Sequence, residues 1–298
     1  MPRLLRLFIA ILLASIFAAA HAQSDLPSVG FSLIKTGSLR VREGMMYAGG
    51  SFGKDAETVF SAVLVKHGGE FFLFDTGLGS KIAEQYSQDM PLWNRPFFRY
   101  EEPVTPARVQ LDKAGIGPIR RIVLSHSHWD HVSGIGDFPE AQVWVPEQEL
   151  AVIRQPVSSL GGPWPSQVGG ESIRWQTLEF KPEPYEGFSH SADLFNDGKV
   201  VLVPMFGHTP GSVGMFVTVD SGRRYFFVGD VVWNADAVKG ASPKFWAARL
   251  LVDKDADRTM RTIEQVRAVL EKKPDTVVVP AHDGQVQGAL GYFPAWIR

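Results

Sequence analysis

Three histidines and one aspartate fall within residues 126–131, which read His-Ser-His-Trp-Asp-His and follow the apolar run at 121–125. Imidazole nitrogens and carboxylate oxygens are the ligands that a divalent cation such as zinc takes in proteins. Six consecutive residues cannot wrap four such groups around one ion, so the spacing indicates two ions side by side. Any fold adopted by this chain must therefore bring further ligands to this segment from other parts of the sequence.

Three later apolar runs, each typical of a β-strand, also end close to a residue of the metal-binding type. These residues are His208, Asp230 and His282. Strand ends that meet at one rim of a sheet fold can bring together side chains that are far apart in the sequence. The pattern therefore predicts one site, built from four strand ends.

These motifs and their order resemble the metallo-β-lactamase superfamily, and most of all its acyl-homoserine-lactonase-like branch. The resemblance rests on the box at 126–131, Gly-His-Thr-Pro-Gly at 207–211, Gly-Asp at 229–230 and His282. Upstream, Phe-Asp-Thr-Gly at 74–77 matches a further signature of the superfamily. The resemblance implies an α/β fold, a four-layer αββα sandwich with a dinuclear metal centre at one edge.

By position, the resemblance assigns three ligands to a first metal, three to a second, and one aspartate as the bridge between them. In that order they are His126, His128 and His208; Asp130, His131 and His282; and Asp230. Nitrogen and oxygen donors favour two divalent ions, with Zn²⁺ as the first expectation, although manganese, iron and cobalt accept the same ligands. The catalytic residues expected are Asp130, which would also shuttle a proton, and Asp230.

The resemblance implies a hydrolase for a small molecule, in which a hydroxide shared by the two ions attacks a carbonyl or phosphoryl centre. The favoured substrate is an ester or lactone like an acyl-homoserine lactone. The alternatives are a periplasmic phosphotriester or aryl-ester hydrolase, then a β-lactamase, then a metal-binding protein without activity. Similar β-lactamases usually lack the bridging carboxylate, so Asp230 argues against that reading, and retention of all seven ligands argues against an inactive protein.

Four apolar residues are candidates for the substrate pocket: Trp129, Trp233, Phe206 and Met46. Trp129 lies between two ligands, and Trp233 follows Asp230 by three residues. Many lactonases that this chain resembles carry tyrosine at the place of Trp233, where its hydroxyl polarises the substrate carbonyl. Indole offers only an N–H donor. The departure bears on the lactone assignment and leaves the metal centre untouched.

Four further aspartates are considered for roles outside the ligand set. Asp75 is expected to be structural or to orient a ligand imidazole, and Asp283 to be solvated or to form a turn. Asp253 or Asp255 is expected to cap a helix that carries apolar residues on one face.

The first 22 residues are expected to be a signal peptide, because basic Arg3 and Arg6 precede an apolar run that ends at Ala20-His21-Ala22. Removal of this segment would leave a single metallo-hydrolase domain, residues 23–298, in the periplasm or outside the cell. The chain contains no cysteine, so no disulfide is available there.

Composition limits the classes of molecule that the protein is expected to bind. Hydrophobic residues make up 45% of the 298 residues and charged residues 21%, as in an ordinary globular protein. A formal net charge of −2 gives no electrostatic case for binding nucleic acid or, after cleavage of the signal peptide, a membrane. The resemblance allows a homodimer, although no heptad or isolated apolar stripe indicates one.

Overall fold

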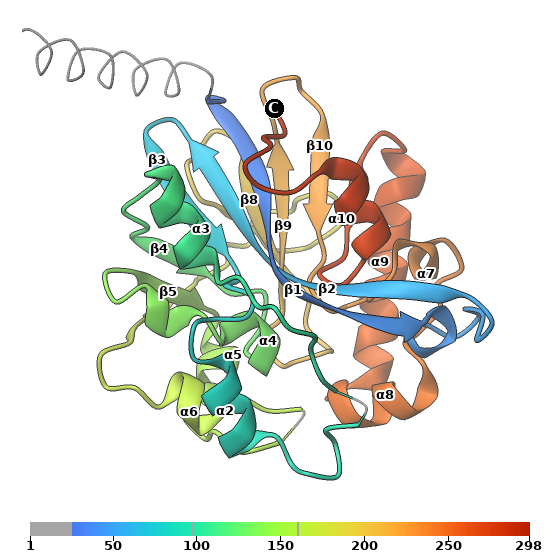
Figure 1. Ribbon diagram of the computed structural model, residues 1–298. Helices are drawn as coiled ribbons and strands as arrows, with labels where there is room; N and C mark the ends of the chain where they lie inside the picture. The colour runs from blue at the N-terminus through green and yellow to red at the C-terminus, as the bar shows by residue number, and fades with distance from the viewer. Residues whose placement is uncertain (1–25, 97, 160) are drawn as a thin grey trace, which may run out of the picture.

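The computed structural model describes residues 26–96, 98–159 and 161–298. Two β-sheets face each other in the middle of the molecule, and helices cover the outer face of each sheet (Figure 1). The predicted α/β class and four-layer αββα arrangement are therefore confirmed. The proposed signal peptide, residues 1–22, lies outside the described residues. Within the described ranges, no helix has both the length and the apolar character needed to cross a bilayer.

The first sheet has the strand order β1-β2-β3-β4-β5-β6. Its strands are β1 (Val29–Arg42), β2 (Asp55–His67), β3 (Glu70–Phe74), β4 (Arg121–Val123), β5 (Gln142–Val145) and β6 (Arg174–Thr177). The first three strands pair antiparallel and the pairs from β3 to β6 are parallel. The tight β2–β3 connection turns at Gly68, whose φ of 55° suits a residue without a Cβ atom.

The second sheet has the order β11-β10-β9-β8-β7. Its strands are β7 (Ala192–Asp193), β8 (Val200–Pro204), β9 (Val213–Thr218), β10 (Arg224–Phe227) and β11 (Val277–Val279). The β10–β11 pair is parallel and the other pairs are antiparallel. Buried side chains of the two sheets meet between them, for example Phe31 and Phe72 against Leu202 and Met215. This shared apolar layer holds the sheets face to face.

The helices and short 3-10 turns lie outside this core. They are η1 (Glu43–Met45), α2 (Ile82–Asp89), α3 (Ala107–Ala114), α4 (Trp129–Val132), η2 (Ile135–Asp137), α5 (Glu147–Ile153), α6 (Pro165–Val168), α7 (Ala235–Lys239), α8 (Trp246–Val252), α9 (Ala256–Lys272) and α10 (Gly284–Leu290). Helix α9 buries Ile263, Val266 and Val269 against the second sheet, as its 3.6-residue apolar period predicts. The predicted cap is Asp255, whose carboxylate accepts the backbone N–H of Arg258.

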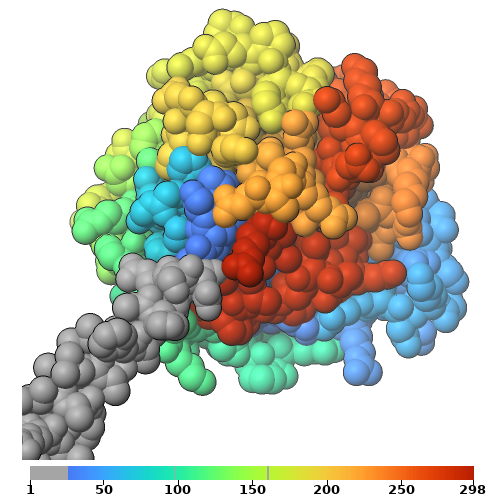
Figure 2. Space-filling model, turned by 90° about the horizontal axis from the view of Figure 1, so that it is seen from above, coloured from blue at the N-terminus to red at the C-terminus, as the bar shows by residue number. Residues whose placement is uncertain are grey.

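The C-terminal segment closes one end of the sandwich beside the start of β1 (Figure 2). Phe31 and Ile297 exchange two backbone hydrogen bonds of 3.1 and 2.8 Å. The metal-type residues lie at the other end of the strands: the chain reaches residues 126, 208, 230 and 282 within a few residues after β4, β8, β10 and β11. The predicted convergence of four strand ends is therefore present in the fold.

Candidate metal centre

The backbone changes conformation inside the box at 126–131, and this change divides its ligands into two sets. His128 is extended, with φ of −72° and ψ of 155°, and the next residue begins the helical turn α4. The extended part presents His126 and His128, whereas the helical turn presents Asp130 and His131. The geometry of this loop therefore serves two neighbouring groups of ligands.

The first group consists of His126, His128 and His208. The Nε2 atom of His208 lies 3.2 Å from Nε2 of His126 and 3.0 Å from Nδ1 of His128. All three residues are at least 96% buried, since their exposed fractions are 1%, 4% and 1%. Three imidazole nitrogens thus point at one small volume.

The second group consists of Asp130, His131 and His282. Oδ2 of Asp130 lies 3.3 Å from Nε2 of His282 and 3.8 Å from Nε2 of His131. This group is also buried. The two groups match the two ligand sets expected from the sequence.

The carboxylate of Asp230 lies between the groups. Its Oδ1 atom is 3.2 Å from Nε2 of His131 and 3.1 Å from Nε2 of His282. Its Oδ2 atom is 3.6 Å from Nε2 of His208 and 4.0 Å from Nε2 of His126. Oδ2 also lies 3.2 Å from Nε2 of His282. The carboxylate therefore lies within 4.0 Å of nitrogens from both groups, which is the placement that a bridging ligand requires.

In four of the five histidines of the two ligand groups, a hydrogen bond at Nδ1 fixes the orientation of the ring. The pairs are His126 with Ser125 Oγ at 3.0 Å, His131 with Asp75 Oδ2 at 2.8 Å, His208 with Asp253 Oδ1 at 2.7 Å, and His282 with the carbonyl of Val59 at 2.9 Å. Carboxylate and carbonyl oxygens only accept, so in three pairs Nδ1 donates and Nε2 keeps its lone pair towards the cluster.

This arrangement fits divalent cations. The converging nitrogen lone pairs repel one another at about 3 Å unless a positive charge lies between them. Nε2 of His131 and Oδ1 of Asp230 have no hydrogen-bond partner among the described residues, although both atoms are buried. Buried polar atoms normally have partners, so these atoms are free to act as ligands.

Local electrostatics favour the ligand forms of His126, His128 and Asp230. Burial, and then the neighbouring imidazoles, hold the pKa of His126 and His128 well below the ordinary value, so both are neutral. Burial alone would also lower the pKa of His131 and His282, but the neighbouring carboxylate of Asp230 outweighs it and raises both. Burial alone would raise the pKa of Asp230, but His282 and His131 outweigh it and hold that pKa well below the ordinary value. The bridging position is therefore an ionised carboxylate.

Behind the first group lies a buried ion pair that the sequence did not reveal. Oδ1 of Asp253 accepts from His208 and also from Nζ of Lys244 at 2.8 Å. Burial opposes its charge, but Lys244 and His208 lower the pKa of Asp253 to about 2. Asp253 therefore orients a ligand, and the helix cap predicted for Asp253 or Asp255 falls to Asp255.

The other two aspartates also have defined places. Oδ2 of Asp75 accepts from His131, and its two oxygens also accept the backbone N–H and hydroxyl of Ser125. This is the orienting role expected for Asp75. Asp283 is buried and caps α10 by accepting two backbone N–H groups. Of the two expectations for Asp283, solvation is wrong, and a local role in shaping the backbone agrees with the structure.

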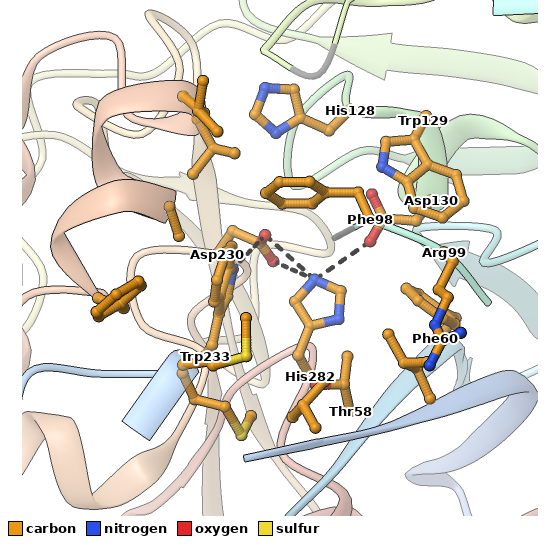
Figure 3. A pocket seen from close by; sticks show the side chains of 18 of the residues that line it. Thr58, Phe60, Phe98, Arg99, His128, Trp129, Asp130, Asp230, Trp233 and His282 are labelled. Carbon is orange, nitrogen blue, oxygen red and sulfur yellow. Dashed lines mark hydrogen bonds and ion pairs between the residues drawn. The ribbon is translucent and has the colours of Figure 1, made fainter. Parts of the chain in front are cut away.

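An apolar pocket of about 280 Å³ opens over the cluster (Figure 3). Three of the four predicted pocket residues, Trp129, Trp233 and Met46, line it. The other lining residues are Leu39, Val41, Met45, Thr58, Phe60, Phe98, Arg99, His128, Asp130, Asp230, Phe245, Ala247, Ala248, Leu251, Val252 and His282. Phe98 and Arg99 come from the long connection between α2 and α3, and no motif predicted that these two residues reach the pocket.

The prediction for Phe206 is wrong. Its side chain lines a separate groove, where it lies 4.8 Å from the guanidinium of Arg258 and contacts Phe180. Gly207 has a φ of 145°, which turns the chain between Phe206 and His208. The two side chains therefore face different sides, although they are close in sequence.

Comparison with known proteins identifies the family. A protein-family model described as "Metallo-beta-lactamase superfamily" matches residues 59–282. The chain belongs to the metallo-beta-lactamase superfamily. The matched range begins in β2 and ends at His282, so it contains both ligand groups and the bridging residue.

Curated proteins are similar to this chain over more than half of its length. A "Probable metallo-hydrolase" of Mycobacterium tuberculosis is 32% identical over 208 residues, which are 63% of this chain and 62% of that protein. The chain thus spans less than two thirds of that relative. An "N-acyl homoserine lactonase AttM" of Azorhizobium caulinodans is 25% identical over 275 residues, which are 88% of this chain and 97% of that protein.

Solved structures share the fold of this chain. A mutant of AiiA from B. thuringiensis, bound to N-decanoyl-L-homoserine, has a TM-score of 0.68 and 17% identity and covers 91% of this chain and 100% of its own. AidC, described as a dizinc quorum-quenching lactonase, has a TM-score of 0.55 and 16% identity and covers 87% of this chain and 92% of its own. The resemblance to the acyl-homoserine-lactonase-like branch is thus confirmed as a similarity of sequence and fold.

Proposed function

We propose that this protein is a metal-dependent hydrolase that opens an ester or lactone bond of a small apolar molecule, with an acyl-homoserine-lactone-like compound as the first candidate. The observation that carries the proposal is the placement of seven buried ligand residues beneath an apolar pocket. An apolar pocket over a dinuclear centre would suit hydrolysis of a substrate with an apolar body. The similarity to AttM, named as an N-acyl homoserine lactonase, supports the choice of substrate.

The ligand residues would hold two divalent cations, with zinc as the first expectation, in the two groups joined by Asp230. When bound, such a pair supplies an activated water at neutral pH and electrostatic stabilisation of a negatively charged transition state. Asp75 and Asp253 fix the imidazoles of His131 and His208, so the ligands need little rearrangement.

Asp130 is the proposed proton shuttle. Its carboxylate belongs to the second ligand group and also faces the pocket (Figure 3). Among the described residues that line this pocket, Asp130 and Asp230 are the carboxylates. Asp130 can therefore take a proton released during attack and pass it to the leaving oxygen.

The pocket wall supplies the binding energy for an apolar substrate. Leu39, Phe60, Met46 and Phe245 present carbon surface to the cavity. Each methylene that leaves water here contributes about 0.8 kcal/mol. A fatty acyl chain fits this lining better than a polar group does, which favours an acyl lactone over a charged phosphomonoester.

The proposal is tested by a hydrolysis panel on the metal-loaded protein without its signal peptide. The panel contains acyl-homoserine lactones of short and long chain, a phosphotriester, an aryl ester and a cephalosporin. We expect turnover of the lactones, and loss of both turnover and bound metal in Asp230→Ala. Asp112→Asn, on an exposed face of α3, serves as the control and should retain both. Turnover of the phosphotriester alone, or full activity without metal, would refute the lactone proposal.

We also propose that the enzyme acts outside the cytoplasm, after cleavage behind Ala22. The support is the basic start, apolar run and small residues of the first 22 positions. Expression in a bacterium, followed by N-terminal sequencing of the periplasmic fraction, is expected to give a chain that starts at Gln23. Recovery of the intact chain in the cytoplasm would contradict this location.

A further inference from the structure

Glu149, on helix α5, is fully buried yet has no basic partner among the described residues within ion-pair distance. Its carboxylate instead accepts four hydrogen bonds, all from two loops that carry metal-type histidines. Burying a carboxylate is costly unless its oxygens are satisfied by donors. The four donors offset that cost, and they tie both loops to one side chain.

The first loop is the box at 126–131. Oε1 of Glu149 accepts the backbone N–H of Ser127 at 2.7 Å and its hydroxyl at 2.5 Å. Ser127 stands between His126 and His128 in the chain. Fixing both the backbone and the side chain of this one residue limits the rotation of the extended segment from which the two imidazoles project.

The second loop carries His208. Oε2 of Glu149 accepts the hydroxyl of Thr209 at 2.7 Å and the backbone N–H of Gly211 at 3.0 Å. A Cβ atom at residue 211 would come within 2.5 Å of the backbone nitrogen and Cβ of Glu149. Only glycine therefore allows this loop to lie so close to α5.

We propose that Glu149 is a positioning residue that sets the spacing of the first ligand group. It connects the segment of His126 and His128 to the segment of His208, across 22 and 62 residues of chain. The second group is held by other contacts, namely Asp75 behind His131 and the carbonyl of Val59 behind His282. The inference rests on the metal centre of the proposed function, but it does not depend on the substrate.

The substitution Glu149→Gln removes the negative charge and one hydrogen-bond acceptor of this side chain but keeps its volume. A carboxamide keeps the size of the side chain but replaces one acceptor oxygen by an NH₂ group. That NH₂ group must face the backbone N–H of either Ser127 or Gly211, so one loop loses its backbone hydrogen bond, although the hydroxyl beside it can turn and accept from the NH₂ group. The ligand set of the first group then loses its fixed spacing.

The test measures Zn²⁺ affinity at each group separately, by native mass spectrometry with a competing chelator. The background His282→Ala leaves the first group intact, and the background His208→Ala leaves the second. Glu149→Gln is expected to weaken zinc binding about 10- to 100-fold in the first background and to leave the second unchanged. Glu147→Gln is the matched control, because Glu147 lies on the same helix with 57% of its side chain exposed, and it should match its parent in both.

Several outcomes overturn the inference. One is that Glu149→Gln leaves the zinc affinity unchanged in the His282→Ala background. Another is that it weakens zinc binding equally in both backgrounds, which would indicate general destabilisation. Should Glu149→Gln not fold, the pair Ser127→Ala and Thr209→Val removes two of the donors and keeps the carboxylate. That pair is expected to weaken only the first group, by several-fold, and the same two results would again refute the role of Glu149. Absence of zinc binding in the unsubstituted protein would instead refute the proposed function.

Discussion

Trp233 donates its indole N–H to Oδ2 of Asp230 at 2.8 Å. The same oxygen lies 3.6 Å from Nε2 of His208 and 3.2 Å from Nε2 of His282, so the indole holds the carboxylate between the two ligand groups. A donor committed to Asp230 is not available for a substrate carbonyl. The tryptophan at this place therefore serves the metal centre, whereas a tyrosine hydroxyl at the same place in similar lactonases is expected to serve the substrate.

We predict that Trp233→Phe weakens metal binding about tenfold, because it removes the hydrogen bond and keeps an aromatic ring of the pocket wall. Chelator competition on the zinc-loaded protein measures this change. Trp93→Phe is the control, since Trp93 is 67% exposed and should leave the affinity unchanged. Equal affinities of Trp233→Phe and the unsubstituted protein would show that the hydrogen bond does not orient Asp230.

The buried pair of Lys244 and Asp253 gives a second prediction. Both side chains are only 1% exposed, and Lys244→Met would leave the carboxylate with His208 as its hydrogen-bond donor. Loss of one partner from a buried ion pair typically costs about 3–5 kcal/mol. The free energy of unfolding, measured by urea denaturation, should therefore fall by about 3–5 kcal/mol.

The control for this experiment is an exposed lysine in a similar pair. Lys239, with 75% of its side chain exposed, pairs with Asp236 at 2.6 Å. Lys239→Met should change the free energy of unfolding by less than about 1 kcal/mol. A fall of the same size in both variants would mean that burial adds nothing to the Lys244 pair.

The ligand set was predictable because each member stands at a strand end or in a compact motif. His208, Asp230 and His282 follow apolar runs that the fold uses as β8, β10 and β11. Parallel and antiparallel strands of one sandwich bring such ends to a common rim, so the order of motifs was enough to predict their convergence. The hairpin turn at Gly68 was visible for the same reason, since its signal is local.

The residues behind the ligands were not predictable in this way. Glu149 contacts residues 22, 60 and 62 positions away, and Lys244 reaches Asp253 across nine positions that include helix α8. No local pattern marks a glutamate on a short helix as the acceptor of two loops. Phe206 was misplaced because one glycine with positive φ reverses the direction of neighbouring side chains, and periodicity does not report such a turn.

Removal of metal should destabilise the protein. Bound cations would stabilise the folded state, because they offset the repulsion among the converging ligand atoms. A ligand at 100 times its dissociation constant adds about 2.7 kcal/mol to the free energy of unfolding. Calorimetry with and without a chelator should therefore show a lower Tm in the chelator. In His208→Ala the shift should be smaller, because one ligand group is incomplete. Identical transitions of the unsubstituted protein with and without chelator would contradict a metal-stabilised fold.

The pocket wall predicts how the enzyme selects chain length. Leu251 of α8 lines the cavity with 41% of its surface exposed, so a larger side chain there would project into the space above the cluster. Leu251→Trp should shorten the preferred acyl chain, with the ratio of kcat/KM for long over short lactones falling about tenfold, equivalent to about two methylenes of lost burial. Leu250→Trp is the matched control, since Leu250 is 73% exposed and lies outside the lining. If both variants change the ratio equally, or if neither changes it, the cavity beside α8 does not hold the acyl chain. The apolar part of the substrate must then extend from the metal centre along another side of the pocket.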